Sequence, residues 1–202
     1  MTTRPRETPA GRAPVGRPAP GGATARPREV QVKPVPLTLD LPNFKCFGCS
    51  AANEYGLNLQ FFRKGVEVVC DYTPPKHLQG WYGTVHGGIL CTLLDELGSW
   101  AVTGLRRRIG MTRDVVVHYR RPVYVEEPIH LAATLGEEQG PLVKVIGRIG
   151  NQRGDLCVEG EITVFMLEEP QFARMVPDGQ VPPALKPYFP SASPAARPLP
   201  RR

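Results

Sequence analysis

The sequence predicts an α+β fold in which an antiparallel sheet curves around one long central helix. Six stretches show the alternation or apolar content of strands, at residues 57–61, 66–72, 112–120, 129–137, 142–150 and 156–167. A single long helical pattern, about residues 87–103, stands between the second and third of them. Because most of these strands are joined by short turns, they favour antiparallel pairing and exclude a doubly wound sheet.

The connections follow from local residue types. Residues 63–65 (RKG) predict the turn between the first two strands, and Pro74-Pro75 ends the second. A loop with two aromatic residues and two glycines, residues 77–85 (HLQGWYGTV), then leads to the helix, which is expected to end near Gly104. Gly140-Pro141 and residues 152–155 (QRGD) predict the later turns.

The chain of 202 residues divides by composition into three parts. Residues 1–40 are predicted to be a disordered, basic, proline-rich tail, residues 41–170 the folded domain, and residues 171–202 a second proline-rich tail. The first tail holds seven basic and three acidic residues and the second five and one, so the middle carries a net charge of −2. This distribution argues against a nucleic-acid-binding core.

The sequence predicts a soluble, cytoplasmic protein without membrane insertion. No apolar run reaches the ~20 residues of a membrane helix, and the N-terminus lacks the apolar region of a secretory signal. The five cysteines are odd in number and scattered, which is typical of free thiols in a reducing compartment.

The long helix has two different faces. At 100° per residue, one arc of about 140° is apolar and can bury against a sheet. It contains Ile89, Leu90, Leu93, Leu94, Leu97, Trp100 and Ala101. Asp95 points almost opposite, among the small residues Cys91, Thr92, Gly98 and Ser99, while Glu96 lies at the edge of the apolar arc. A solvated face usually carries longer polar side chains, so this one is expected to receive a second subunit, a ligand or both.

The helix begins with a glycine pair after a histidine. The N-terminal amide groups of a helix are unpaired, and without side chains at Gly87 and Gly88 a substrate oxygen can approach them as in an oxyanion hole. His86 could cap the helix, form a core hydrogen bond or take part in catalysis.

Helix geometry then predicts a dimer. Asp95 lies eight residues beyond Gly87, or ~12 Å along the axis, which is too far for both to act on one carbonyl. Two antiparallel copies of the helix related by a twofold axis would bring Gly87 of one copy to Asp95 of the other.

Residues 86–96 (HGGILCTLLDE) resemble the HGG…D signature of hotdog-fold acyl-CoA thioesterases of the phenylacetate-degradation type. Residues 46–50 (CFGCS) and 53–59 (NEYGLNL) look like the entry segment of a bacterial subgroup, so the resemblance covers about residues 44–167. It implies a hotdog fold, a homodimer or homotetramer, and thioester hydrolysis at the dimer interface. Asp95 would be the nucleophile or general base, the Gly87 amide would polarise the carbonyl, His86 would orient the loop or thioester, and Thr112 would position water or the carboxylate.

The remaining candidates would bind substrate. Gly88 belongs to the helix start, and Trp81 and Tyr82 are candidates for lining the acyl pocket. Arg120 and Arg121 are candidates for the phosphates of coenzyme A. Many relatives have Asn six residues before the histidine, where this chain has Gly80, and Gln79 beside it is a candidate replacement.

No metal or other cofactor is expected, since a thioester has a good leaving group. Cys46-x-x-Cys49 could begin a zinc or redox site, but no second pair follows to complete four ligands. The predicted function is hydrolysis of an acyl-CoA to free acid and coenzyme A. The alternative is a non-catalytic acyl-CoA-binding module with a regulatory or scaffolding role, which the glycine at position 80 favours slightly.

Overall fold

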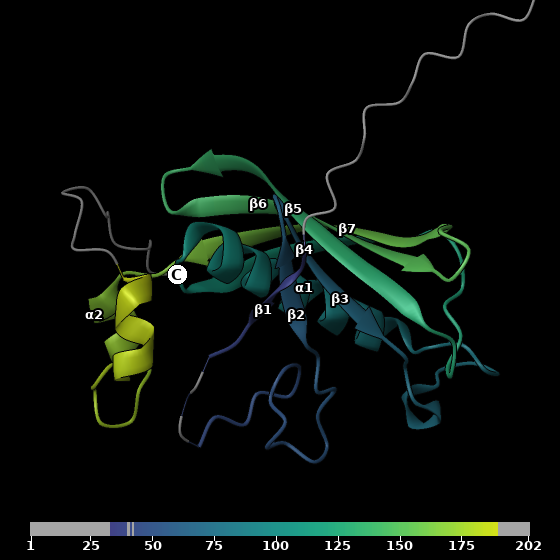
Figure 1. Cartoon of the computed structure of the whole chain (residues 1–202), viewed down its shortest axis with the longest axis horizontal. Helices are drawn as coiled ribbons and strands as arrows, with labels where there is room; N and C mark the ends of the chain where they lie inside the picture. The colour runs from purple at the N-terminus through teal and green to yellow at the C-terminus, as the bar shows by residue number, and fades with distance from the viewer. Residues whose placement is uncertain (1–32, 40, 42, 190–202) are drawn as a thin grey trace, which may run out of the picture. The chain divides into compact units, whose positions relative to one another are not determined.

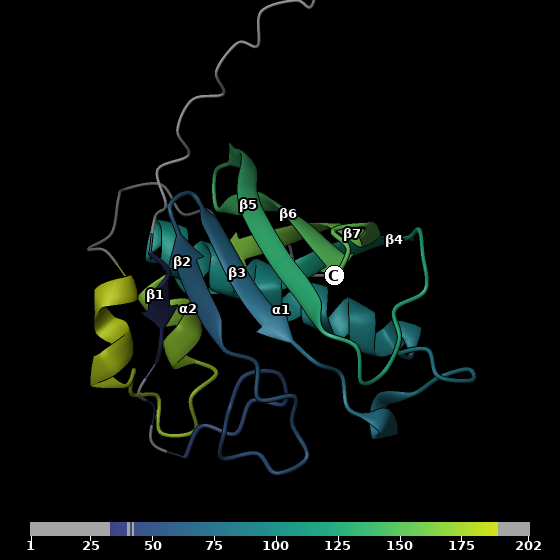
Figure 2. The same ribbon diagram turned by 45° about the vertical axis from the view of Figure 1, so that its right-hand side comes forward.

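The computed structural model describes residues 33–39, 41 and 43–189. It contains a seven-stranded antiparallel sheet in the order β1-β2-β3-β5-β6-β7-β4. The strands are β1 (Val35–Leu37), β2 (Phe61–Lys64), β3 (Glu67–Tyr72), β4 (Gly110–Tyr119), β5 (Ile129–Gln139), β6 (Leu142–Asn151) and β7 (Leu156–Met166). The long helix α1 (Gly87–Arg106) packs against six of them, β2 to β7. Both views show it along one face of the curved sheet (Figures 1 and 2), which confirms the predicted fold class.

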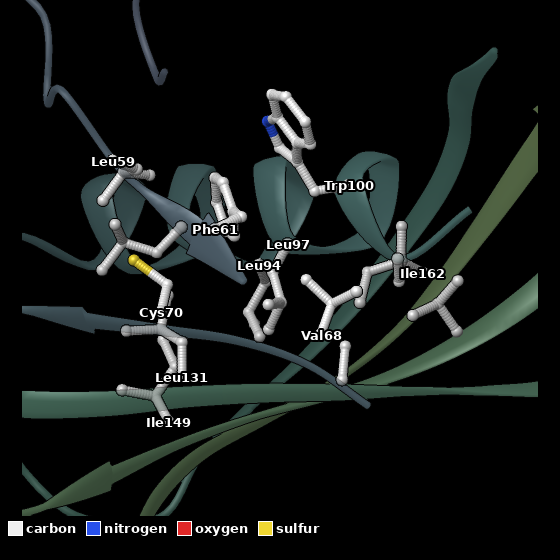
Figure 3. Packing of buried hydrophobic residues seen from close by; sticks show 14 of the residues in the cluster. Leu59, Phe61, Val68, Cys70, Leu94, Leu97, Trp100, Leu131, Ile149 and Ile162 are labelled. Carbon is white, nitrogen blue, oxygen red and sulfur yellow. The ribbon is translucent and has the colours of Figure 1, made fainter. Parts of the chain in front are cut away.

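The apolar arc of α1 is buried as predicted. Leu93, Leu94 and Leu97 are fully enclosed, and Trp100 stacks on Phe61 with ring centroids 5.5 Å apart. Figure 3 shows Leu94, Leu97, Trp100 and Phe61 where the helix meets the strands. The remaining predicted members of the arc, Leu90 and Ala101, are also buried, while Ile89 is half-buried.

Leu94 fits a notch that two glycines leave in the sheet. Gly147 of β6 and Gly160 of β7 are directly paired. A methyl group added at either would lie 2.9 Å or 2.8 Å from a Leu94 methyl carbon. The helix therefore approaches β6 and β7 closely only because both strands lack a side chain at this point.

The predicted first strand is displaced. Residues 57–61 alternate, and Leu57 and Leu59 are buried. The strand that pairs with β3, however, is β2, which begins only at Phe61. The amides of Leu57 and Leu59 instead donate to the carbonyls of Phe47 and Gly48, so the alternation reflects pairing with the cysteine-containing segment. The turn between β2 and β3 falls at residues 65–66, one or two positions after the predicted one.

Two helix glycines have different roles from those predicted. The helix continues past Gly104 to Arg106, and Arg107 in the left-handed region ends it. Gly104 is buried, where an added methyl would lie 2.5 Å from Leu37 of β1. Gly98 is also buried, and its methyl would lie 2.7 Å from Ile162, so it faces the sheet instead of the small-residue face.

Parts of both predicted tails are ordered against the domain. β1 lies within residues 1–40, whereas α2 (Glu169–Ala173) and a 3-10 helix (Pro183–Tyr188) lie at the end of the described chain. A second apolar cluster holds Leu167, Val181, Leu185 and Phe189. The predicted disorder of residues 1–32 and 190–202 lies outside the described residues. None of the helices in the described part is both long and apolar enough to cross a membrane.

Candidate active site

The start of α1 is formed by the residues that the sequence singled out. His86 is the N-cap, and its Nδ1 accepts the Gly88 amide over 3.0 Å. The His86 carbonyl accepts the amides of Ile89 and Leu90. His86 is therefore a structural cap, and the Gly88 amide is already paired.

The Gly87 amide is different. Among the described residues it donates to no acceptor, and Gly87 is the first residue of the helix, where the macrodipole favours negative charge. A methyl group at Gly87 would meet nothing closer than the Tyr119 hydroxyl at 3.6 Å. A side chain as small as that of alanine therefore fits at this position.

Tyr119 fixes the helix start to β4, a contact that the sequence analysis missed. Its hydroxyl donates to the Gly87 carbonyl over 2.9 Å. Partial desolvation of the phenol, which is still 54% exposed, raises the pKa of Tyr119, and a nearby Cys91 thiolate would raise it further. In the sequence, Tyr119 is an aromatic residue with a hydroxyl group at the end of a predicted strand, and this pattern does not reveal its hydrogen-bond partner.

Asp95 lies on the helix side that the sheet does not cover. It is half-buried, as are Cys91, Thr92 and Ser99 on the same side. Among the described residues its carboxylate takes part in no ion pair. The charge is thus held on a helix face of small side chains without a neighbouring cation.

Thr112 lies at an irregular point of β4. It pairs with Val164, and a β-bulge follows between Thr112 and Asp114. Its hydroxyl is buried and has no hydrogen-bond partner among the described residues. Bulges often occur beside active sites, and an unpaired buried hydroxyl is a group that a ligand or water can satisfy. No hydrogen bond of the described chain joins Thr112 to Asp95.

The loop before the helix is closed by Gln79. Its Oε1 accepts the Gly83 amide over 2.9 Å, so this oxygen holds the loop together. A methyl at Gly80 would lie 3.0 Å from the His86 Cα, which explains why a small residue stands where an asparagine was expected. At the loop tip, Trp81 and Tyr82 are 80% and 93% exposed.

The candidate phosphate-binding arginines are partly engaged. Arg120 pairs with Glu159 at 2.9 Å, and Arg121 donates to the Leu156 carbonyl over 2.9 Å. Both side chains are exposed at the end of β4. They remain reachable by an anionic ligand, and Tyr119, directly before them in the chain, contacts Gly87 at the helix start.

A second polar cluster lies beside Asp95 on α1. The Cys46 thiol donates to Glu96 Oε1 over 3.2 Å, and Cys49 lies next to both. Burial raises the pKa of Glu96 to about 7, with the Cys46 hydrogen bond adding to it. A hydrogen bond between the two thiols lowers the pKa of Cys46 and raises the pKa of Cys49. The sequence pattern gave no indication that Glu96 meets the cysteines.

Comparison with known families identifies this architecture. Residues 82–158 match the family model of the thioesterase superfamily. A search of curated proteins gives no match. The family match spans the helix start, α1 and β4 to the beginning of β7, which contain most of the candidate residues.

Solved structures agree with this result. A crystal structure of a thioesterase superfamily protein is 27% identical, with a TM-score of 0.51, and the match covers 56% of this chain and 58% of that one. The chain thus spans little more than half the length of this relative. Thioesterase superfamily member 2 of zebrafish is 22% identical with a TM-score of 0.51, covering 57% of this chain and 89% of that one.

The PaaI protein of the phenylacetic acid degradation operon of E. coli is 14% identical, with a TM-score of 0.51, and the match covers 55% of this chain and 80% of that chain. At these identities, the zebrafish and E. coli structures support the fold. The resemblance predicted from the sequence is confirmed at the level of the superfamily: the described chain has the hotdog fold, and residues 82–158 carry the thioesterase-superfamily pattern.

Proposed function

We propose that this protein hydrolyses an acyl-CoA thioester to the free acid and coenzyme A, at a site shared by two copies of the chain. The observation that carries the proposal is that the Gly87 amide at the helix start and the Asp95 carboxylate further along the helix both lack a partner among the described residues. Each supplies one half of the chemistry that acyl transfer to water needs.

The edge of the sheet supports a dimer. β4 is an edge strand of ten residues, and Met111, Val116 and Tyr119 on it are exposed. A long edge with apolar side chains is a template for pairing with another chain. α1 and β4 run in opposite directions, because Tyr119 at the end of β4 contacts Gly87 at the start of α1. When two β4 strands pair antiparallel about a twofold axis, the two α1 helices are therefore also antiparallel.

That arrangement brings the Gly87 amide and an Asp95 carboxylate together, although they are far apart within one chain. Within one chain Gly87 and Asp95 are ~12 Å apart along the helix axis. In the antiparallel pair, Gly87 of one copy faces Asp95 of the other, with Cys91 midway between them and near the twofold axis. Two equivalent sites result, each built from both copies.

The chemical roles follow from these positions. The Gly87 amide hydrogen-bonds the thioester oxygen as negative charge develops on it. Asp95 of the other copy acts as general base toward water, or as nucleophile through an acyl-enzyme anhydride that water then opens. In either route the coenzyme A thiolate leaves. His86 holds Gly88 and thereby the helix start, and Thr112 offers a buried hydroxyl that has no partner among the described residues. The exposed Arg120 and Arg121 are the candidates for binding the phosphates of coenzyme A.

Two substitutions test the proposal on a panel of acyl-CoAs of graded chain length and aromaticity, by release of free thiol. Asp95→Asn is expected to lower turnover at least ~10²-fold while the melting temperature stays unchanged. Gly87→Pro removes the amide hydrogen at the first helical position, where proline is well tolerated. His86 already has the extended backbone (φ −60°, ψ 133°) that a following proline requires.

Gly87→Ala is the matched control, since it keeps the amide and its methyl fits beside Tyr119. Gly87→Pro is expected to lose ~10²–10³-fold in kcat and Gly87→Ala much less. Equal activities of the proline and alanine variants would remove the amide from the mechanism. Tight acyl-CoA binding without any thiol release would favour the non-catalytic binding module instead.

A further inference from the structure

The segment before the sheet is built around a close contact with α1. The Gly48 Cα faces the Glu96 side chain so tightly that an added methyl would lie 2.2 Å from its Cγ and Cδ carbons. Glycine at this position lets the carboxylate reach the two flanking cysteines. The predicted cysteine pair therefore meets a third potential metal ligand from the helix.

The loop is held in place by its own hydrogen bonds. The Ser50 amide donates to the Cys46 carbonyl over 3.2 Å, and the Ser50 hydroxyl donates to the Phe44 carbonyl over 2.6 Å. The Leu57 and Leu59 amides bind the two carbonyls between the cysteines. The backbone that carries the two cysteines is thus held in place by the chain itself.

The three donor atoms are close enough to share one ion. Sγ of Cys46, Sγ of Cys49 and a carboxylate oxygen of Glu96 all lie within 4.8 Å of one another. Around a tetrahedral zinc ion, with bonds of ~2.3 Å to sulfur and ~2.0 Å to oxygen, such atoms are ~3.5–3.8 Å apart. Small side-chain movements would reduce the separations in this structure to those around a bound zinc ion.

The surroundings favour a cation. Among the described residues Glu96 takes part in no ion pair, and a thiol is a weak hydrogen-bond donor to a half-buried carboxylate. A cavity of about 220 Å³ adjoins all three groups. It leaves room for water as the fourth ligand, the coordination that zinc keeps when it has three protein ligands.

We propose that Cys46, Cys49 and Glu96 bind one zinc ion, which fastens the segment before the sheet to α1 next to Asp95. Two thiolates and a carboxylate suit zinc better than magnesium or calcium, which prefer oxygen alone. Binding displaces the thiol protons to solvent and changes no oxidation state. The sequence favoured no metal here because it shows no second cysteine pair, and the structure supplies the carboxylate that spacing could not reveal.

The test uses the full chain, reduced, stripped of metal and then titrated with zinc against a chromogenic chelator. One equivalent per chain is expected by elemental analysis. Cys46→Ser and Cys49→Ser are expected to lose it, and Glu96→Gln to weaken it at least ~10-fold. Cys91→Ser and Asp95→Asn are the matched controls for thiol and carboxylate, and both are expected to keep full stoichiometry.

Cobalt in place of zinc gives an absorption spectrum that reports the metal ligands directly, which a loss of folding stability alone would not explain. Cobalt bound to the reduced protein is expected to show thiolate charge-transfer and tetrahedral ligand-field bands, which Glu96→Gln shifts. Because a cysteine variant can fail to fold, Gly48→Ala serves as a second probe, since its methyl displaces Glu96 without removing a ligand. Zinc stoichiometry near zero in the reduced wild-type chain, or equal affinity in Glu96→Gln, would overturn the assignment. So would a Cys46–Cys49 disulfide that persists under reducing conditions.

Discussion

The contact between Leu94 and the glycine notch gives a prediction with a magnitude. Leu94→Ala removes a fully buried side chain whose methyl carbons face Gly147 and Gly160. Because glycines face Leu94 on both strands, only the side chains that border the notch, such as Ile162 and Leu97, can move to refill part of the space. We expect a loss of about 3–5 kcal/mol, which corresponds to ~6–20 °C in Tm for a domain of this size.

A double-mutant cycle isolates this contact. Gly160→Ala alone places a methyl 2.8 Å from Leu94 and is expected to cost ~1–3 kcal/mol by overpacking. In the Leu94→Ala background the same methyl fills part of the cavity. The double variant should therefore be at least ~1 kcal/mol more stable than the sum of the single changes predicts.

Urea unfolding followed by circular dichroism measures each free energy. Val66→Ala is the control, because this side chain in the β2–β3 turn is 79% exposed and should change stability by less than ~0.5 kcal/mol. A loss below ~1.5 kcal/mol for Leu94→Ala, or strict additivity in the cycle, would contradict the close packing of α1 on β6 and β7.

Two further outcomes are expected. Asn151→Ala should cost ~1–3 kcal/mol in urea unfolding, because its side chain accepts the Arg153 and Asp155 amides over 3.0 Å in the β6–β7 turn, whereas the exposed Gln152→Ala should cost almost nothing. Burial raises the pKa of Cys70 from 9.0 to about 11, so at pH 8 its thiol stays protonated and its thiolate fraction is ~10²-fold smaller than that of an exposed cysteine. Its reaction with a thiol reagent in the native protein should be correspondingly slow, and modification at the rate seen in denaturant would contradict this burial.

The periodic part of the fold was predictable from local sequence. The apolar arc of α1 and the late strands follow from side-chain spacing, which local geometry enforces. The displaced first strand shows where this fails. Leu57 and Leu59 alternate as strand residues do, yet their amides bind the loop carbonyls of Phe47 and Gly48. Alternation reports burial on one side and not which partner takes the hydrogen bonds.

The glycines show a second limit. Gly98 and Gly104 were interpreted as an open face and a helix end, but both are sites of close contact with side chains from other strands. A missing side chain has the same local signature in each case. Only the position of Ile162 or Leu37 in the folded chain decides between these roles.

The candidate site divides in the same way. The sequence located the helix start and the Gly87 amide, because these depend on adjacent residues, but it left the role of His86 open, and the structure shows this residue as the N-cap. The contacts of Tyr119 with Gly87 and of Glu96 with Cys46 join residues 32 and 50 positions apart. Such contacts depend on the registers of several strands, which no local pattern encodes.

The central claim, that each active site takes Gly87 from one copy and Asp95 from the other, is tested most directly by mixing two inactive variants. Gly87→Pro and Asp95→Asn chains are unfolded together, refolded and assayed for thiol release from the best acyl-CoA substrate. With random pairing, half of the dimers are mixed and each mixed dimer has one intact site, so activity should recover to about one quarter of wild type. If the mixture stays as inactive as its components, the two residues act within a single chain and the shared site is refuted.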